Sequence, residues 1–244
     1  MAKRPSEVPP AVVRERNRGS RETANLAEGL AVDFAVLAEH AELPVFALDR
    51  LAQSRTEGVT KRMRLAGELV AEAGEVARSA SHVSDTVRGW ACFAIGITAD
   101  SLEVALEAIR PLADDGHFGV REWAWLGVRP LIAAEPERAI ELLTPWTLDT
   151  SENTRRFARE ATRPRGVWCP HISLLKDQPE LGLPVLRPLR SDSSRYVQDS
   201  VANWLNDAAK TQPRWVDTLT HGWREVAGGD PHTARICRRA RRSL

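Results

Sequence analysis

Arginine side chains concentrate in two stretches of this sequence. The stretch 155–165 holds five arginines against the single acid Glu160, and the stretch 235–242 holds five arginines and no acid. A planar guanidinium can bind two phosphate oxygens at once, which makes arginine well suited to polyanions. The two stretches therefore predict a surface that binds phosphates. The alternatives are a solvated helix face for the first stretch and a frayed tail for the second.

The net charge of the chain hides this concentration of basic residues. Over all 244 residues, 34 basic side chains nearly balance 33 acidic ones, which leaves a formal charge of +1. Residues 155–244 carry 17 basic and 9 acidic side chains, whereas residues 22–154 carry 11 basic and 22 acidic ones. A polyanion would therefore be held mainly by the last third of the chain.

Composition excludes several classes of protein. A chain of 244 residues with 43% apolar and 27% charged side chains is typical of one globular domain or two small ones. No apolar run approaches the roughly 18 residues of a membrane span, and residues 1–21 are too charged for a signal peptide, so we expect a cytoplasmic protein without membrane association. Cys92, Cys169 and Cys237 lie far apart, which argues against a disulfide framework and against a zinc site.

One phrase recurs along the chain, a polar turn followed by an apolar helix. Its copies are anchored, at spacings of 33, 34, 43 and 37 residues, by Val87, Val120, Thr154, Val197 and Ala234. Repeats of this size are typical of paired helices, and no stretch alternates with period two. The pattern predicts an all-α, HEAT-like helical repeat solenoid with a concave face. We expect one repeat domain over residues 21–244, preceded by a polar basic arm at residues 1–20 for which disorder is an alternative.

Four phrases give the sequence a family likeness. They occupy residues 22–35, 117–124 with 128–130, 155–168 and 196–207. In this order they resemble the AlkC branch of the AlkC/AlkD family of bacterial DNA glycosylases. The resemblance implies HEAT-like repeat enzymes that remove positively charged N-alkylated bases, such as 3-methyladenine, from double-stranded DNA held on the concave face. It also implies action without a metal or organic cofactor and without flipping of the base. We expect the protein to act as a monomer.

That reaction needs negative charge near the sugar. An N3- or N7-alkylated purine is cationic, so its glycosidic bond is weak and the sugar becomes oxocarbenium-like as the bond breaks. A carboxylate about 4 Å away would stabilise this cation by roughly 4 kcal/mol at an effective dielectric constant near 20, equivalent to about a thousandfold in rate. Glu122 and Glu160 fall on Glu positions of the family's motifs, in equivalent helices of adjacent repeats. We expect at least one to be catalytic and both to face one pocket. The alternative is two helix-surface glutamates bridged to arginines.

Tryptophan supplies an electron-rich surface for a cationic base. The sequence has eight tryptophans against five phenylalanines and one tyrosine, and an indole face attracts a cation by about 0.5–2 kcal/mol. Trp168 follows Arg163-Pro-Arg165 as the family pattern has it, and it is the first candidate for a catalytic contact with the base. Trp123, as a DNA contact, and Trp125 come next, with core packing as the alternative. Core packing is the favoured interpretation for the other five, Trp90, Trp146, Trp204, Trp215 and Trp223.

Arginine and asparagine side chains complete the predicted DNA contacts. They are Arg156, Arg159, Arg163, Arg165 and Asn203. The arginines would bind phosphates flanking the lesion, and the asparagine could donate to the DNA backbone, although a bond to the backbone of a neighbouring repeat is the favoured interpretation for it. The sequence departs from the family next to this site, since Gly166-Val167 stands where Leu-Pro is usual. This departure leaves the substrate range in more doubt than the fold.

Two other functions fit parts of the pattern. A non-catalytic HEAT-repeat binder of damaged or branched DNA would use the same arginines, and its binding would weaken steeply as salt rises without release of any base. A protein-interaction scaffold is the default for a helical array, but it leaves the arginines of 155–165 without a purpose. The glycosylase interpretation remains the leading one because it alone uses both glutamates.

Overall fold

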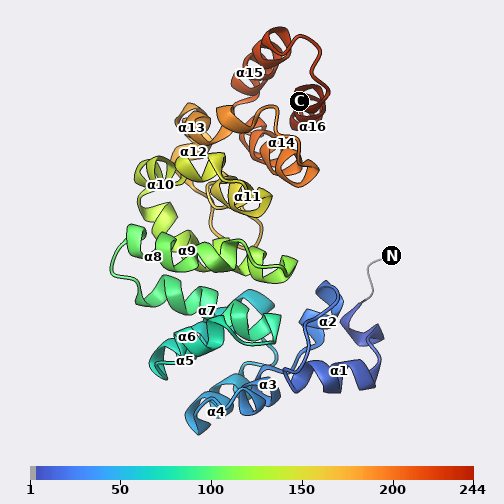
Figure 1. Ribbon diagram of the computed structural model, residues 1–244, viewed down its shortest axis with the longest axis vertical. Coiled ribbons are helices and arrows are strands. Elements are labelled where there is room, and N and C mark those ends of the chain that lie inside the picture. Colours follow the sequence, from blue (N-terminus) through green and yellow to red (C-terminus); the bar gives the residue numbers. More distant parts are fainter. Residues whose placement is uncertain (1–3) are drawn as a thin grey trace. The chain divides into compact units, whose positions relative to one another are not determined.

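The computed structural model describes residues 4–244, and no strand occurs among them (Figure 1). The prediction of an all-α fold is confirmed. The chain divides into two compact units, one reaching to Val128 and the other running from Arg129 to Leu244. No helix in residues 4–244 combines the length and the apolar character needed to cross a membrane.

The first unit contains short helices at its start and longer ones toward its end. Helices α5 and α7 lie side by side in it (Figure 1). Its elements are η1 (Pro5–Glu7), α1 (Pro10–Asn17), α2 (Leu26–Ala31), α3 (Phe34–His40), α4 (Val45–Gln53), α5 (Val59–Glu72), α6 (Val76–Ala80), α7 (Asp85–Thr98), α8 (Leu102–Ala113) and the first part of α9 (Phe118–Ala134).

The second unit is organised around α14, which contacts α11 and α16. Its elements are the rest of α9, α10 (Pro136–Leu143), η2 (Pro145–Leu148), α11 (Glu152–Glu160), α12 (Ser173–Asp177), η3 (Pro179–Gly182), α13 (Leu183–Leu186), η4 (Arg187–Leu189), α14 (Arg195–Ala209), α15 (Pro213–Val226) and α16 (Pro231–Ala240). The arginine-rich stretch at 235–242 is therefore mainly helical, and the alternative of a frayed tail is wrong for α16.

The segment expected as a polar arm contains helix α1. The structure describes this segment from Arg4 onward, so Met1, Ala2 and Lys3 lie outside the described residues. Val8 is buried, and Arg16 of α1 donates from Nε to Glu28 of α2 at 2.9 Å. Helix α1 also contacts α3. From Pro5 onward the segment thus contains helical structure, and α1 is folded against the first unit.

The predicted repeat is built by one hydrogen-bonded turn. The residue after each of the first four anchors donates to the carbonyl oxygens of the residues six and five positions earlier. Arg88, for example, donates from Nη1 to His82 and Val83 at 2.8 and 2.9 Å. The equivalent donors in the later copies are Arg121, Arg155 and Gln198. These bonds satisfy carbonyl groups before each of the four helices, and they explain why a long polar side chain follows each of the first four anchors.

An aspartate in the next turn connects successive repeats within each unit. Arg88 binds Asp115 through Nε and Nη2 at 2.8 and 3.1 Å in the first unit. Arg155 binds Asp192 through the same two atoms at 2.7 and 3.2 Å in the second. These paired bonds raise the pKa of Arg155 despite its partial burial. Arg155, one of the five arginines in 155–165, is therefore used by the fold.

Tryptophan fills the cores of both units, as expected for most of the group. Trp90 and Trp204 are completely buried, and Trp146 and Trp223 are nearly so. Glycine permits a close approach elsewhere in the first unit, because a Cβ on Gly96 would lie 2.2 Å from the carbonyl oxygen of Gly127. Helices α7 and α9 therefore approach each other more closely at this point than larger residues would allow.

Candidate functional site

Glu160 ends helix α11 and points into the second unit. Its side chain is buried, at 2% exposure for the residue. Ser200 of α14 donates its hydroxyl to Oε1 at 2.7 Å, and Arg163 donates from Nη1 to Oε2 at 3.2 Å. A nitrogen of Arg156 lies 3.8 Å from Oε1. Packing of α11 on α14 thus brings together groups that are 40 residues apart in the sequence.

These contacts keep Glu160 ionised. Burial acts to raise its pKa, but the charges of Arg156 and Arg163, with the hydrogen bonds from Ser200 and Arg163, lower the pKa below its ordinary value. A group in this state is suited to stabilising a cation and unsuited to donating a proton. The contacts with Arg156 and Arg163 are those expected from the alternative of a glutamate bridged to arginines, although Glu160 is buried and not on the helix surface. Its catalytic role stays a prediction.

Arg163 bridges two buried acids. It donates to Glu160 and, from Nε, to Asp207 of α14 at 2.8 Å, and its Nη2 lies 2.7 Å from the same carboxylate oxygen. In this conformation the guanidinium that we expected at a phosphate is engaged by carboxylates. Asp207 was missed as a site residue. The only available signal was its position in the last of the four family phrases, at residues 196–207.

Arg159, which we expected to contact DNA, lies in the interior of the second unit. The residue is 0% exposed, and none of its three guanidinium nitrogens has a hydrogen-bond partner. Burial lowers its pKa to about 10. The side chain cannot reach a phosphate in this conformation, because its position on α11 turns it into the unit. Arg156 is also largely buried, and its guanidinium lies 4.3 Å from the ring centre of Tyr196.

Trp168 projects from the loop between α11 and α12, residues 161–172, which we call the Trp168 loop. It is 50% exposed, and its backbone has a φ of 63°, which is uncommon for a bulky residue. The neighbouring Val167 is also exposed, and Arg165 is half-buried with a partnerless Nε. An exposed indole offers an aromatic face to a base, and the contact with the base that we expected of Trp168 stays a prediction.

Arg129, near the middle of α9, is a second residue that sequence reasoning missed. Its side chain is buried in the second unit, where it donates to the carbonyl oxygens of Ala161 and Arg163, both at 2.6 Å. The signal was an arginine between apolar residues in the phrase at 128–130. Because a buried arginine needs partners, its position indicated a backbone or carboxylate contact.

Asn203 of α14 forms a hydrogen bond to an arginine that follows α16. Its Oδ1 accepts a hydrogen bond from Nη2 of Arg242 at 2.9 Å. Two further arginines of the 235–242 stretch pair with Asp199 on α14, Arg235 at 2.7 Å and Arg239 at 3.0 Å. Much of this stretch therefore helps to dock α16. The favoured interpretation of Asn203 was a bond to a neighbouring repeat's backbone, whereas the observed partner is the side chain of Arg242.

Glu122 lies one turn into α9, in the first unit. It is half-buried, and its Oε2 accepts a hydrogen bond from Nε1 of the buried Trp125 at 2.9 Å. Trp123 packs with its ring centre 6.0 Å from that of Phe93. Trp125 therefore belongs to the core, while Glu122 retains partial exposure. Since Glu122 and Glu160 belong to different units, their convergence on one pocket stays a prediction.

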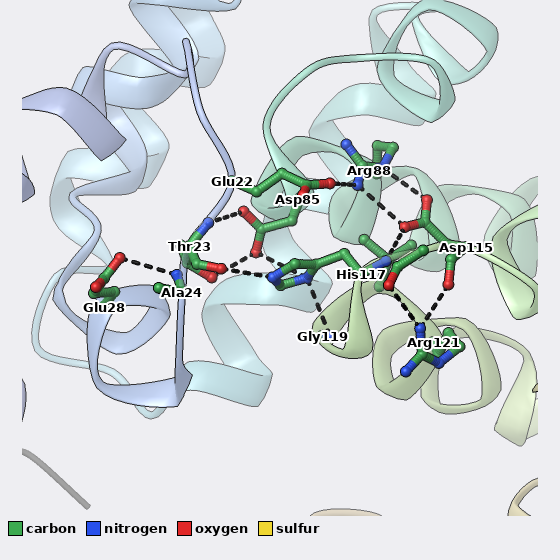
Figure 2. Close-up of polar contacts among 12 residues, drawn as sticks. Glu22, Thr23, Ala24, Glu28, Asp85, Arg88, Asp115, His117, Gly119 and Arg121 are labelled. Carbon is green, nitrogen blue, oxygen red and sulfur yellow. Dashed lines mark hydrogen bonds and ion pairs between the residues drawn. The ribbon is translucent and has the colours of Figure 1, made fainter.

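A polar network holds the start of α9 in place (Figure 2). Asp85 accepts hydrogen bonds from the backbone N–H and the hydroxyl of Thr23, at 2.8 and 2.9 Å. Gly119 donates its N–H to Nδ1 of His117 at 3.1 Å, so we assign the proton to Nε2, which donates to the Thr23 carbonyl at 2.7 Å. The first family phrase thus anchors the helix that carries Glu122.

Comparisons with known proteins extend these observations. No family model matches the chain. The uncharacterised protein YhaZ of Bacillus subtilis is 38% identical over 138 residues, which are 57% of this chain and 37% of that protein. The chain therefore spans little more than a third of the length of this relative.

Two solved structures have a similar fold. The Pseudomonas fluorescens alkylpurine DNA glycosylase AlkC, bound to DNA containing an abasic site analog, matches with a TM-score of 0.65 and 24% identity, over 100% of this chain and 65% of that one. The protein smu.31 from Streptococcus mutans UA159 matches with a TM-score of 0.59 and 19% identity, over 81% of this chain and 90% of that one. This chain therefore has the helical fold of AlkC, as its sequence resemblance predicted.

Proposed function

We propose that this protein is a DNA repair glycosylase that excises positively charged N-alkylated bases, such as 3-methyladenine, from duplex DNA. The observation that carries the proposal is Glu160, a buried carboxylate kept ionised at the point where the chain enters the Trp168 loop. The AlkC fold and the resemblance to the AlkC branch support the same conclusion.

The proposed reaction is hydrolysis of the N-glycosidic bond. The bonding electrons leave with the cationic base, which becomes neutral, while positive charge develops on the sugar. Glu160 and Glu122 are the proposed carboxylates that stabilise this charge and place the attacking water. As the new C–O bond forms, the proton of this water passes to one of the carboxylates and from there to solvent. One such carboxylate would contribute roughly 4 kcal/mol at about 4 Å.

Trp168 is the proposed contact for the alkylated base. Its half-exposed indole could attract a cationic base through its face by about 0.5–2 kcal/mol. Arg165 is the loop arginine that we assign to a neighbouring phosphate, because the residue is partly exposed whereas Arg159 is completely buried. We propose, from the family resemblance, that the base stays unflipped, that no cofactor takes part and that a single chain acts alone.

The test is release of free 3-methyladenine from alkylated duplex DNA under single-turnover conditions. Glu160→Gln and Glu122→Gln are each expected to slow release at least a hundredfold, because the charge is lost while the shape is kept. The control is Glu141→Gln, which removes an exposed carboxylate of α10 and should retain the rate within twofold. Full activity of both site variants would refute the mechanism. Salt-sensitive binding without any release would favour the non-catalytic DNA binder.

A further inference from the structure

Arg129 binds the backbone of the Trp168 loop from inside the second unit. Its side chain is 1% exposed, and two different guanidinium nitrogens donate to the carbonyl oxygens of Ala161 and Arg163, each at 2.6 Å. A longer contact of 3.5 Å joins Nη2 to the carbonyl oxygen of Pro170. One side chain therefore binds the backbone on both sides of Trp168.

The loop is closed by a hydrogen bond of its own as well. The N–H of Ile172 donates to the carbonyl oxygen of Pro164 at 3.1 Å, so the chain returns to its starting point eight residues later. Pro164 and Ile172 are both buried, whereas Val167 and Trp168 at the tip are exposed. The base of the loop is thus fixed within the unit, and its tip faces outward.

Gly166 allows the loop backbone to lie close to the guanidinium of Arg129. A Cβ at this position would lie 2.3 Å from Sγ of Cys169 and 3.5 Å from Nη2 of Arg129. The Cys169 thiol therefore occupies the space that any larger residue at 166 would need. A side chain at position 166 would therefore require Cys169 to move.

The backbone of Trp168 needs such support. A tryptophan with a φ of 63° lies in the left-handed region, which bulky residues rarely adopt unless their surroundings hold them there. Arg129 contacts the backbone before and after Trp168, so it supplies part of this support.

We propose that Arg129 is a positioning residue that acts through Trp168, holding the indole in the orientation that receives the base. This role rests on the proposed function. Arg129 itself does not contact the DNA, because its guanidinium is buried and directed at carbonyl oxygens. Loss of the clamp should release the loop and disorient Trp168 without removing any group that touches the substrate.

The clamp can be tested without activity by limited trypsin digestion of the native protein. Trypsin cleaves after arginine unless proline follows, so Arg165–Gly166 is a cleavable bond in the loop and Arg163–Pro164 is not. In Arg129→Met, cleavage at Arg165–Gly166, followed by mass spectrometry, is expected to be at least tenfold faster than in the unmodified protein. Equal cleavage rates would overturn the clamp.

The matched control is Arg155→Met. Arg155 is a partly buried arginine of the same unit that also binds two backbone carbonyls, but these belong to the turn before α11 and not to the Trp168 loop. Both variants are compared at the same interval below their melting temperatures. If Arg155→Met accelerates cleavage at Arg165–Gly166 as much as Arg129→Met does, the effect is general destabilisation and the proposal fails.

The positioning role is tested by a double-mutant cycle on base release. Arg129→Met is expected to lower kcat at least tenfold with KM changed less than threefold, and to have no further effect in a Trp168→Ala background. Additive effects would show that Arg129 does not act through Trp168. Arg129→Lys keeps the charge but cannot donate from two separated nitrogens, so its kcat should lie between those of the unmodified protein and Arg129→Met. It replaces Arg129→Met in the cycle if that variant does not fold. If the unmodified protein releases no base, the proposed function fails, whereas the digestion still decides whether the clamp exists.

Discussion

Two polar regions of this molecule use similar residues in different ways. In the first unit, Asp85 and His117 bind the backbone of Thr23, so polar groups on three separate segments satisfy one another (Figure 2). In the second unit, Glu160 and Asp207 share Arg163, and a nearby loop carries a tryptophan with a left-handed backbone. Satisfied networks build folds, whereas strained residues and ionised buried groups gather at functional sites. The comparison supports a structural role for the Thr23 network, and under the proposed function it assigns the catalytic role to the Glu160 region.

The largest effect is expected from breaking the Thr23 network. Asp85→Ala removes the acceptor for two buried donors of Thr23, each of which costs about 1–3 kcal/mol when left without a partner. The free energy of unfolding, measured by urea denaturation, should fall by about 3 kcal/mol. Asp49→Ala, at an exposed position of α4, is the control and should change it by less than about 0.5 kcal/mol. A loss of similar size in both variants would show that the Thr23 network stabilises the fold no more than an exposed residue does.

A change in the Trp168 loop should affect activity more than stability. Gly166→Ala forces a methyl group to within 2.3 Å of the present position of Sγ in Cys169, so the loop must open. We expect base release to slow about tenfold, equivalent to roughly 1.4 kcal/mol, with a smaller change in the free energy of unfolding. The double variant Gly166→Ala/Cys169→Ala should recover most of the rate because the clash is removed. No recovery would mean that Gly166 matters for another reason.

The smallest effect is expected at Arg159. Replacement of a buried, poorly paired charge by an apolar side chain of similar length is often neutral or stabilising, so Arg159→Met should leave the free energy of unfolding unchanged or raise it by about 1 kcal/mol. The salt dependence of DNA binding should not change. Arg165→Gln should instead reduce the slope of log K against log salt by about one, as expected for one lost phosphate contact. A reduced slope in Arg159→Met would restore Arg159 as a DNA contact.

Local sequence signals predicted the framework of this protein well. The all-α class and the repeat anchors followed from turn residues, helix periodicity and the spacings between Val87, Val120 and Thr154, and these depend on interactions within a few residues. The same signals placed Glu122 and Glu160 in helices of the repeats, where the structure has α9 and α11. They also predicted most of the buried tryptophans, because a large apolar ring at a helical core position has few alternatives.

Only the tertiary structure decided what the charged residues contact. The sequence shows five arginines in 155–165, but packing of α11 on α14 turned Arg159 into the interior, and Asp207 met Arg163 from 44 residues away. Arg129 reached the Trp168 loop across 32 residues for the same kind of reason. A composition pattern records how many charges a segment carries. Which of them face solvent depends on the rotation of each helix against its neighbours, and this rotation is set by packing between distant segments.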